Sequence, residues 1–396
     1  MTHYTVSAQN LIGTIDLPPF KSEVIRMLLL YALSGVRPSS VVESSDSYGE
    51  DINHAISSAD SLYDSIVNGT VPEFEVGESA TLFRLLIPMV LALFGEGRFI
   101  LGKGIINRSA DEYIKSLNCN INISNNCMTI TGDLHMQSSC CYSVSTERSS
   151  QFASGILMAL PLLDESSLRI ALSDSEQYCM VSMPYFNLTR QIMPLFGVQI
   201  VEYKTNSFIQ LSTRGGYTAP NSYAVSGDGS YAANFIAANY LGSDVNFTNI
   251  PKYVQADTVI SDMLYLNEID ITDCPDIFPI LAIAACAKHE RTIIHGTSRL
   301  RTKECNRVRA MYSGITSLGG FVRLHRDSVE IFGNGQLHGG IVDSYFDHRI
   351  AMAFTIASLI TDKPITIMNA TAVNKSAPQF FNDFIKLGGT VHEHIW

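Results

Sequence analysis

The chain has 396 residues, of which 46% are hydrophobic and 16% are charged. This length exceeds the size at which one hydrophobic core keeps growing, so we expect two domains. The 27 Lys and Arg residues against 38 Asp and Glu residues give a formal net charge of −11. Because no broad basic face is available to neutralise phosphates, this balance argues against a general nucleic-acid or membrane-surface binder.

The spacing of the cysteines and the length of the apolar runs indicate the cellular compartment in which the protein is expected. The eight cysteines contain no CxxC pair and form no Cys/His pattern with zinc-site spacing, so we expect reduced thiols and no metal. Residues 1–5 lack the charged and apolar regions of a signal peptide. The longest apolar run, residues 85–94, contains Pro88 and is too short to span a bilayer. We therefore expect a cytoplasmic protein.

Along the chain, short polar loops precede segments that are rich in Ala, Leu, Ile and Met. Such segments are apolar nearly all round, which is typical of buried helices, and Ser, Asp or Thr before them is typical of helix caps. The predicted buried helices are residues 27–33, 85–93, 152–159, 232–238, 280–287 and 350–357.

A second pattern of helix ends and strands interleaves with these helices. Gly and Asn accept the left-handed conformation that ends many helices. The predicted ends are at Asn118, Gly197, Asn267, Gly319 and Gly388, and strand-like segments follow most of them, including residues 128–131, 208–211 and 329–332. The recurrence predicts about six diverged copies of one α/β unit.

The starts of the predicted helices suggest an anion site. An exposed helix N-terminus offers unpaired N–H groups and a positive dipole end, which suit phosphate or carboxylate. Lys21, Ser22, Ser149, Ser150 and Arg349 stand at such starts. If six related units point their helices toward one centre, that centre should hold anions. The alternative is that Ser and Asp at these places are ordinary helix caps.

Five of the eleven residues from 299 to 309 are basic. If the segment is helical, Lys303, Glu304 and Arg307 lie on one face, because neighbours three and four residues apart meet there. Two cations beside a carboxylate keep it ionised and able to take a proton. The alternative interpretation is a solvated helix face.

Ten short motifs along the chain resemble motifs of the 5-enolpyruvylshikimate-3-phosphate (EPSP) synthase family and occur in the same order as they do in that family. Any one of them is a weak signal, whereas the ordered series over essentially the whole chain is a specific one. The motifs are residues 17–26 (LPPFKSEVIR), 77–84 (GESATLFR), 107–108 (NR), 149–152 (SSQF), 182–185 (SMPY), 227–228 (GD), 275–276 (PD), 303–307 (KECNR), 347–349 (DHR) and 374–375 (NK).

The resemblance implies a transferase of the shikimate pathway, which serves chorismate and aromatic amino-acid biosynthesis. The implied reaction moves the enolpyruvyl group of phosphoenolpyruvate to the 5-hydroxyl of shikimate 3-phosphate, releases phosphate and needs no metal or organic cofactor. The implied α/β fold has two lobes, each with three βαβαββ units whose buried helices point their N-termini at the interdomain cleft. Residues 20–226 would form the shikimate 3-phosphate lobe. Residues 1–19 and 227–396 would form the lobe with the catalytic carboxylates and much of the phosphoenolpyruvate site. We expect a monomer with small-molecule substrates and neither nucleic acid nor membrane as partner.

The resemblance also implies residue roles. Asp276 would exchange the hydroxyl proton with help from Lys21, Glu304 would exchange the proton of the methylene carbon, and Arg84 would support its loop. The implied shikimate 3-phosphate ligands are Lys21, Ser22, Arg26, Ser149, Ser150, Gln151, Ser182, Tyr185, Asp276 and Lys303. The implied phosphoenolpyruvate ligands are Lys21, Arg108, Gln151, Arg307, Arg349 and Lys375.

Some positions depart from the family pattern. Phe20 stands where the family has a small residue, and Glu78 replaces an Asn and would weaken phosphoenolpyruvate binding unless a cation such as Arg84 pairs with it. Ala80 replaces a Gly beside the pocket in which glyphosate competes with phosphoenolpyruvate, so we expect glyphosate insensitivity. Arg299 stands where the family has Asn or Glu, which leaves its role open.

Three alternatives stay open. A catalytically impaired binding homologue is compatible with Phe20 and Glu78. A UDP-sugar enolpyruvyl transferase would have Lys-Asn in place of Lys21-Ser22 and a reactive Cys in the stretch 102–108, which has none. An RNA-end-processing relative is disfavoured by the acidic charge.

Overall fold

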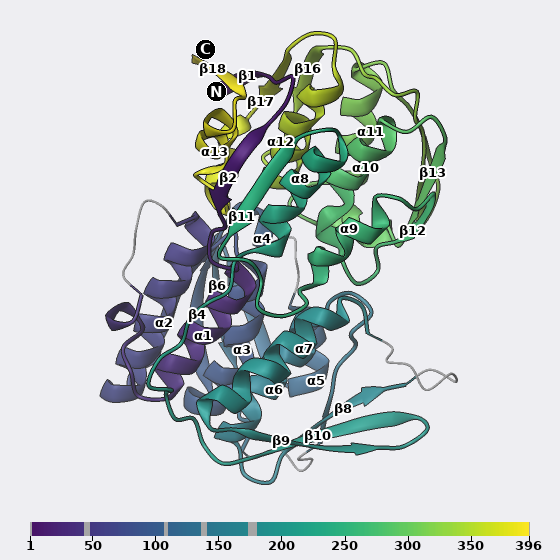
Figure 1. The fold of residues 1–396 in the computed structure, drawn as a ribbon. Helices are drawn as coiled ribbons and strands as arrows, with labels where there is room; N and C mark the ends of the chain where they lie inside the picture. Colours follow the sequence, from purple (N-terminus) through teal and green to yellow (C-terminus); the bar gives the residue numbers. More distant parts are fainter. Residues whose placement is uncertain (1, 43–47, 107–109, 136–140, 173–179, 396) are drawn as a thin grey trace. The chain divides into compact units, whose positions relative to one another are not determined.

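The computed structural model describes residues 2–42, 48–106, 110–135, 141–172 and 180–395 (Figure 1). The chain divides into two compact units. We call one the terminal unit, which comprises Met1–Phe20, Ser47–Gly49 and Ser226–Trp396. We call the other the central unit, which comprises Lys21–Asp46 and Glu50–Val225.

The central unit contains two copies of one β-α-β-α-β-β motif. The first copy consists of β3 (Glu73–Gly77), α3 (Ala80–Phe94), β4 (Glu96–Leu101), α5 (Asp111–Leu117), β5 (Asn120–Ser124) and β6 (Cys127–Thr131). The second copy consists of β7 (Cys141–Ser143), α6 (Gln151–Ala159), β8 (Ser167–Ala171), α7 (Met183–Ile192), β9 (Gln199–Lys204) and β10 (Phe208–Arg214). In each copy the first two strands pair in parallel and the last two form an antiparallel hairpin, which gives the sheet orders β3-β4-β6-β5 and β7-β8-β10-β9. Helices α1 (Lys21–Leu33), α2 (Glu50–Asn68) and α4 (Lys103–Ile106) complete the unit.

The terminal unit repeats the same motif twice. One copy consists of β12 (Glu268–Asp270), α10 (Phe278–Cys286), β13 (Arg291–His295), α11 (Arg307–Ser317), β14 (Phe321–Leu324) and β15 (Ser328–Phe332). The other consists of β16 (Gly340–Asp343), α12 (His348–Ala357), β17 (Ile365–Met368), α13 (Phe380–Lys386) and β18 (Thr390–Ile395), and the N-terminal strand β1 (Thr2–Ser7) completes its sheet. A parallel pair, β2 (Ile12–Asp16) with β11 (Asp244–Thr248), accompanies α8 (Gly229–Tyr240) and α9 (Ile260–Met263).

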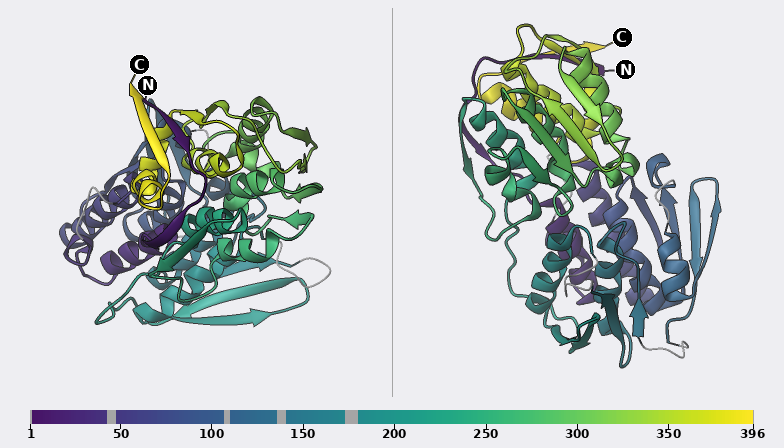
Figure 2. Two further views of the ribbon diagram at one scale, coloured as in Figure 1. Left: turned by 45° about the horizontal axis from the view of Figure 1, so that its top comes forward. Right: turned by 90° about the vertical axis from the view of Figure 1, so that its right-hand side faces the viewer.

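The six predicted buried helices are confirmed as α1, α3, α6, α8, α10 and α12. They form the cores of their units: α3 packs on α6, and α10 packs on both α8 and α12. Figure 2 shows the terminal strands β1 (purple) and β18 (yellow) side by side, where they pair in an antiparallel manner. The predicted repeat is complete in four places within the described residues, because four four-stranded sheets share one strand order. We expected three βαβαββ units per lobe. In the part of the chain that the structure describes, α1 and α2 have no strands of their own, and α8 lies beside a two-stranded sheet.

The helix ends follow the sequence signals with two exceptions. Asn118, Gly197, Gly319 and Gly388 all have positive φ angles, as predicted for left-handed ends. The end predicted at Asn267 is wrong, because α9 stops at Met263 and its cap, Leu264, is right-handed. The second exception is at a helix start: the N-cap of α10 is Ile277, so the alternative interpretation of Asp residues at helix starts as ordinary caps does not hold for Asp276.

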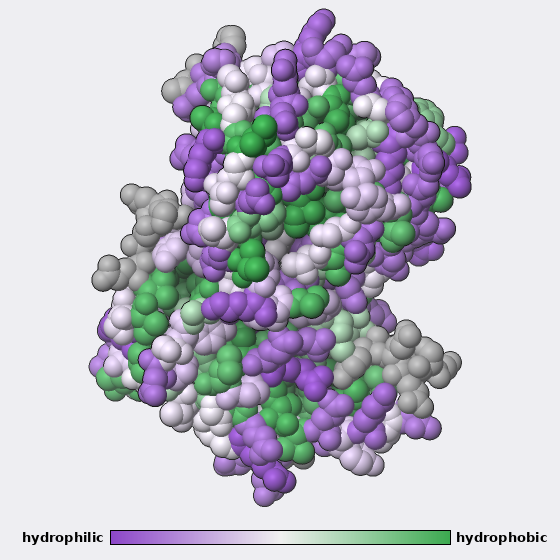
Figure 3. Space-filling view, in the orientation of Figure 1, coloured by the Kyte–Doolittle hydropathy of each residue, from purple (hydrophilic) through white to green (hydrophobic). Residues whose placement is uncertain are grey.

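The described residues contain no helix that is long and apolar enough to cross a membrane. Hydrophilic and hydrophobic side chains are interspersed on the face shown in Figure 3. Most of the apolar side chains of the helices named above are buried.

Candidate functional site

In the terminal unit, three carboxylates surround the buried guanidinium of Arg307, which is 1% exposed. Its Nε donates to Asp347 Oδ2 at 2.7 Å, its Nη1 to Asp276 Oδ1 at 2.7 Å and its Nη2 to Glu304 Oε2 at 2.6 Å. Burial lowers the pKa of Arg307, but Asp347, Glu304 and Asp276 raise it well above its usual value. Arg307 is therefore a permanent cation that organises the group.

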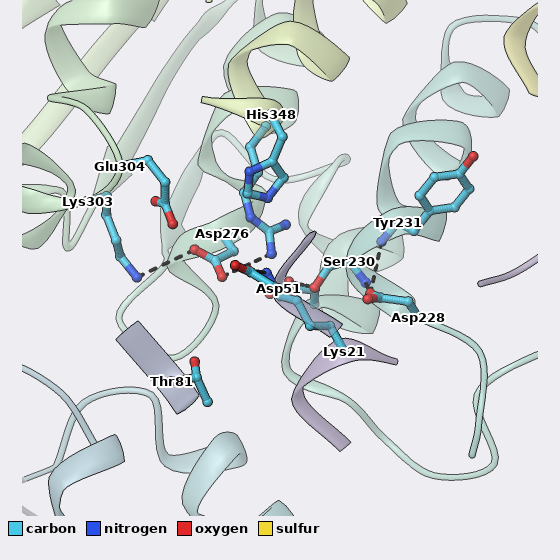
Figure 4. Close-up of polar contacts among 12 residues, drawn as sticks. Lys21, Asp51, Thr81, Asp228, Ser230, Tyr231, Asp276, Lys303, Glu304 and His348 are labelled. Carbon is cyan, nitrogen blue, oxygen red and sulfur yellow. Dashed lines mark hydrogen bonds and ion pairs between the residues drawn. The ribbon is translucent and has the colours of Figure 1, made fainter. Parts of the chain in front are cut away.

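Three further cations border the same carboxylates. Lys303 Nζ lies 3.5 Å from Asp276 Oδ1, and Figure 4 shows this pair joined with Glu304 beside it. Arg349 Nη2 lies 3.1 Å from Asp276 Oδ2, and Lys375 Nζ lies 3.3 Å from Glu304 Oε1. The Asp276 and Glu304 side chains are 21% and 15% exposed, so both can meet a substrate.

The local sequence explains how these side chains are presented. Asn306 caps α11 by accepting a hydrogen bond from the backbone N–H of Arg309 at 3.1 Å, so the helix begins at Arg307. Lys303 and Glu304 lie in the connection after the 3₁₀ turn Ser298–Thr302. The predicted helical face with Lys303, Glu304 and Arg307 is therefore wrong, although Glu304 and Arg307 do pair.

Electrostatics keeps Asp276 ionised. Burial alone would raise the pKa of this carboxyl, but Arg349, Lys303 and Arg307 hold it well below its usual value. Burial also lowers the pKa of the Lys303 ammonium, against the attraction of Asp276. The carboxylate is therefore ionised, and its oxygens can accept a hydrogen bond from a hydroxyl group that is brought against it.

Acid should weaken the folded protein through Asp276. Because the native pKa lies below the unfolded-state value of about 3.9, the ionised carboxylate stabilises the fold at higher pH. This contribution is lost as the pH falls below about 4 and toward the native pKa. Urea unfolding at a series of acidic pH values should show a smaller loss of the free energy of unfolding for Asp276→Asn than for the wild type. Equal losses would remove Asp276 from the acid response.

Asp257 is a buried carboxyl group close to Arg349 and Asp276, and sequence reasoning missed it because it lies in none of the motifs. It is 1% exposed and accepts a hydrogen bond from the Ser230 hydroxyl. Burial raises the pKa of Asp257 to about 6, against the opposing attraction of Arg349. Ser230, Asp276 and Arg349 line a narrow crevice in this region.

In the central unit, Lys21 is the first residue of α1 and pairs with a carboxylate from the first turn of α2. Its Nζ lies 2.8 Å from Asp51 Oδ2, and the Asp51 side chain is 4% exposed (Figure 4). An acidic side chain is favoured in the first turn of a helix, where the dipole is positive. Asp51 therefore fixes the direction of the Lys21 side chain, and the sequence reasoning missed it.

Arg26 joins α1 to α7 in the same unit. Its buried guanidinium donates to Thr189 Oγ1 at 2.7 Å, to the Ser22 carbonyl at 2.8 Å and to the Tyr185 carbonyl at 3.1 Å. These bonds bring Ser22, Arg26 and Tyr185 together, as expected of one binding site. Contact between Arg26 and a substrate carboxylate stays a prediction.

The starts of α6 and α7 also converge. Ser149 Oγ accepts from the Gln151 backbone N–H at 3.2 Å, and Ser150 Oγ donates to the Ser182 carbonyl at 3.0 Å. Ser182 has a left-handed backbone with φ of 56° and precedes α7 directly. Three of the predicted 3-phosphate ligands, all of them serines, thus share one region of the central unit.

Gln151 is held from two sides. Arg84 Nη1 donates to Gln151 Oε1 at 2.9 Å, and Gln151 Nε2 donates to Thr81 Oγ1 at 2.7 Å. The Arg84 guanidinium also lies over the Phe152 ring, 4.7 Å from its centroid. This agrees with the supporting role that we expected for Arg84.

Glu78 lies against the segment that follows β4. Its Oε1 accepts from the Gly104 backbone N–H at 3.1 Å, and a Cβ on Gly104 would come within 2.5 Å of its Oε2. The structure thus gives Glu78 a backbone partner, whereas a pairing with a cation such as Arg84 was the condition that we set for undiminished phosphoenolpyruvate binding. Arg108, a predicted phosphoenolpyruvate ligand, lies outside the described residues.

The arrangement suits organic acid–base chemistry on anions. Among the residues that the structure describes, no group of three or more His, Cys, Asp or Glu side chains is arranged to hold a metal ion. The two partly exposed carboxylates instead lie among four cations, which can bind negative groups while the carboxylates move protons.

Comparison with known proteins places this geometry in a family. The family model described as EPSP synthase (3-phosphoshikimate 1-carboxyvinyltransferase) matches residues 7–265 and 252–384. A 3-phosphoshikimate 1-carboxyvinyltransferase of Clostridium novyi is 34% identical over 346 residues, which cover 81% of this chain and 77% of the relative. One of Clostridium botulinum is 31% identical over 441 aligned positions that cover 99% of each chain.

Solved structures share the fold. The EPSP synthase of Acinetobacter baumannii superposes with a TM-score of 0.75 at 21% identity and full coverage of both chains. The enolpyruvyl transferase NikO of Streptomyces tendae gives a TM-score of 0.71 at 12% identity, covering 99% of this chain and 98% of its own. The predicted α/β enolpyruvyl transferase fold is thereby confirmed. The chain belongs to the EPSP synthase family.

Proposed function

We propose that this chain transfers the enolpyruvyl group of phosphoenolpyruvate to the 5-hydroxyl of shikimate 3-phosphate and releases phosphate. The observation that carries the proposal is the pairing of Asp276 and Glu304 with Arg307 inside a ring of further cations. Both substrates are polyanions, so charge-assisted hydrogen bonds should dominate their binding. Family membership supports the same reaction.

The proposed chemistry has an addition step and an elimination step. In the addition, the 5-hydroxyl oxygen bonds to C2 of phosphoenolpyruvate and loses its proton, while the methylene carbon gains a proton. In the elimination, that carbon loses a proton and the C2–O bond to phosphate breaks. We assign the hydroxyl proton to Asp276 with help from Lys21, and the carbon proton to Glu304.

We assign the binding roles by unit. The central unit would bind shikimate 3-phosphate, through the serines at the starts of α6 and α7, with Ser22, Arg26, Gln151 and Tyr185. The terminal unit would bind the phosphoenolpyruvate carboxylate through Arg307 and Arg349, because the guanidinium fork suits a carboxylate. Lys21, Arg108 and Lys375 would contact its phosphate, Lys303 would contact the 3-phosphate, and cations at the departing phosphate would stabilise its charge.

The cellular setting is also part of the proposal. We assign the protein to the cytoplasm as a monomer that has no nucleic-acid partner, which the acidic composition supports. Light scattering of the purified chain tests the oligomeric state.

One coupled measurement tests the function. Phosphate release from phosphoenolpyruvate should require shikimate 3-phosphate, and a UDP-sugar should not replace it. Binding of shikimate 3-phosphate by calorimetry without any turnover would favour the catalytically impaired homologue. Turnover with the UDP-sugar alone would favour the other enolpyruvyl transferase.

We predict that Ala80 makes the enzyme insensitive to glyphosate. Ala80 is the first residue of α3 and its side chain would crowd the longer inhibitor more than phosphoenolpyruvate. An unrelieved clash costs about 1–3 kcal/mol, which corresponds to roughly 5- to 150-fold in affinity. Ala80→Gly should therefore lower the glyphosate inhibition constant by about this factor and leave the KM for phosphoenolpyruvate nearly unchanged. Inhibition of the unmodified enzyme at glyphosate concentrations near that KM would contradict the prediction.

A further inference from the structure

Asp347 is the most deeply buried carboxylate of the Arg307 group, with an exposed fraction of 0%. Besides accepting a hydrogen bond from the Cys305 thiol at 3.7 Å, it contacts Arg307 and the start of α12. Toward Arg307, its Oδ2 accepts from Nε at 2.7 Å and its Oδ1 lies 3.4 Å from Nη2. Toward α12, its Oδ1 caps the helix by accepting from the Arg349 backbone N–H at 3.0 Å. One side chain thus ties a guanidinium to the helix start that carries the second arginine.

The two edges of the Arg307 guanidinium have partners of different kinds. The edge with Nε faces Asp347, which solvent does not reach. The Nη atoms face Asp276 and Glu304, whose side chains are 21% and 15% exposed. A partner that water and solutes can reach can be exchanged, whereas removing a buried charge from its partner is costly. Asp347 is therefore the fixed partner of Arg307, and the other two carboxylates are the exchangeable ones.

We infer that Asp347 is a positioning residue for phosphoenolpyruvate binding. It holds Arg307 by the Nε edge, so that the Nη atoms can change partners from Asp276 and Glu304 to the carboxylate of the substrate. The same side chain keeps the start of α12, and with it Arg349, in register with Arg307. This inference rests on the proposed function, because it concerns the substrate assigned there. It adds that arrival of the substrate carboxylate releases Asp276 and Glu304 for proton transfer.

Asp347→Asn separates the contact of this side chain with Arg307 from its capping contact with the Arg349 backbone N–H. Asn is as good an N-cap as Asp, so its amide oxygen can still accept from Arg349 N–H. Its NH₂ group, however, faces the Arg307 Nε–H with a second donor. We expect the KM for phosphoenolpyruvate to rise about 10- to 100-fold, while the KM for shikimate 3-phosphate changes little and kcat falls much less.

Two companion variants make the result specific. Asp383→Asn is the matched control: it removes one charge from a half-buried Asp of the same unit that accepts from the Tyr231 hydroxyl at 2.5 Å, and should leave both KM values unchanged. Asp347→Ser keeps a capping oxygen but is too short to reach Arg307, and should reproduce the effect of Asn. An unchanged KM for phosphoenolpyruvate in both Asp347 variants would overturn the inference. So would an equal rise of both KM values with a lowered thermal midpoint, which would mark a merely structural residue.

A further measurement is made on the unaltered protein and needs a variant only to assign one signal. The Arg307 Nε–H resonance, assigned by its loss in Arg307→Lys, should exchange slowly with water and should persist when phosphoenolpyruvate is added. Fast exchange, or loss of the signal on addition, would overturn the fixed contact with Asp347. Absence of turnover with shikimate 3-phosphate would instead contradict the proposed function, and a slowly exchanging signal would still support the hold of Asp347 on Arg307.

Discussion

Glu304→Gln should bind both substrates and turn them over about 10²- to 10⁴-fold more slowly than the wild type, the range that a general acid–base group contributes. The amide has nearly the shape of the carboxylate and can still accept a hydrogen bond from Arg307 or Lys375, but it cannot take up a proton. Glu304 contacts Arg307 at 2.6 Å and Lys375 at 3.3 Å with different oxygens, and the amide oxygen can keep only one of these contacts. The KM for phosphoenolpyruvate should therefore rise, but by less than kcat falls. Steady-state phosphate release with both substrates varied measures both constants.

Glu330→Gln is the matched control for this variant. Glu330 belongs to β15 of the same unit, its side chain is 13% exposed against 15% for Glu304, and it also pairs with a cation, Arg323, at 3.5 Å. Loss of that charge should leave kcat unchanged. A kcat of Glu304→Gln within about threefold of the wild type would remove Glu304 from the chemistry, because a proton relay contributes far more than this.

Local sequence patterns are sufficient to predict the buried helices and the kinds of residue in the site. Ala-, Leu- and Ile-rich segments after polar loops must be buried, and Gly197 or Gly319 ends a helix because its backbone tolerates positive φ. These signals depend only on neighbouring residues. The break between Lys303 and Arg307 was also accessible in principle, because Asn306 is a strong N-cap residue and actually caps α11.

The partners of the buried cations could not be predicted in the same way. Asp347 is 40 residues from Arg307, and Asp51 is 30 residues from Lys21. Which carboxylate pairs with a buried cation depends on how helices from different repeats pack, and short motifs carry no information about that. The pKa of Asp257 has the same origin, since burial raises it to about 6.

The packing also explains an apparent conflict in the Arg307 group. An arginine expected to bind an anionic substrate is surrounded by carboxylates of its own chain, which at first sight should compete with the substrate. Without them, however, a guanidinium with 1% exposure would be an uncompensated buried charge, which is strongly destabilising. Two of the three carboxylates, those of Asp276 and Glu304, are partly exposed. The substrate carboxylate would therefore compete with these two for Arg307, and the proposed chemistry needs both of them to leave Arg307.

Lys21→Met should lower kcat/KM by about 10²- to 10³-fold, the size of effect seen when one preorganised charged donor is removed from a reaction centre. Lys21 is assigned to both substrates and to proton transfer, so this variant tests whether the central unit takes part in the reaction proposed for the carboxylates of the terminal unit. Lys115→Met, an exposed lysine of α5 in the same unit, is the control and should behave as the wild type. Equal activity of the two variants would exclude Lys21 from the mechanism.

The ion pair with Asp51 makes it possible to separate activity from stability. Met at position 21 leaves the Asp51 carboxylate, 4% exposed, without the ammonium at 2.8 Å, which should cost about 1–3 kcal/mol of the free energy of unfolding. Adding Asp51→Asn to Lys21→Met removes that buried charge and should restore most of the stability measured by urea unfolding. It cannot restore the ammonium, so turnover should stay as low as in the single variant. Recovery of turnover together with stability would show that Lys21 acts only through the fold, whereas recovery of stability alone would assign Lys21 to the chemistry.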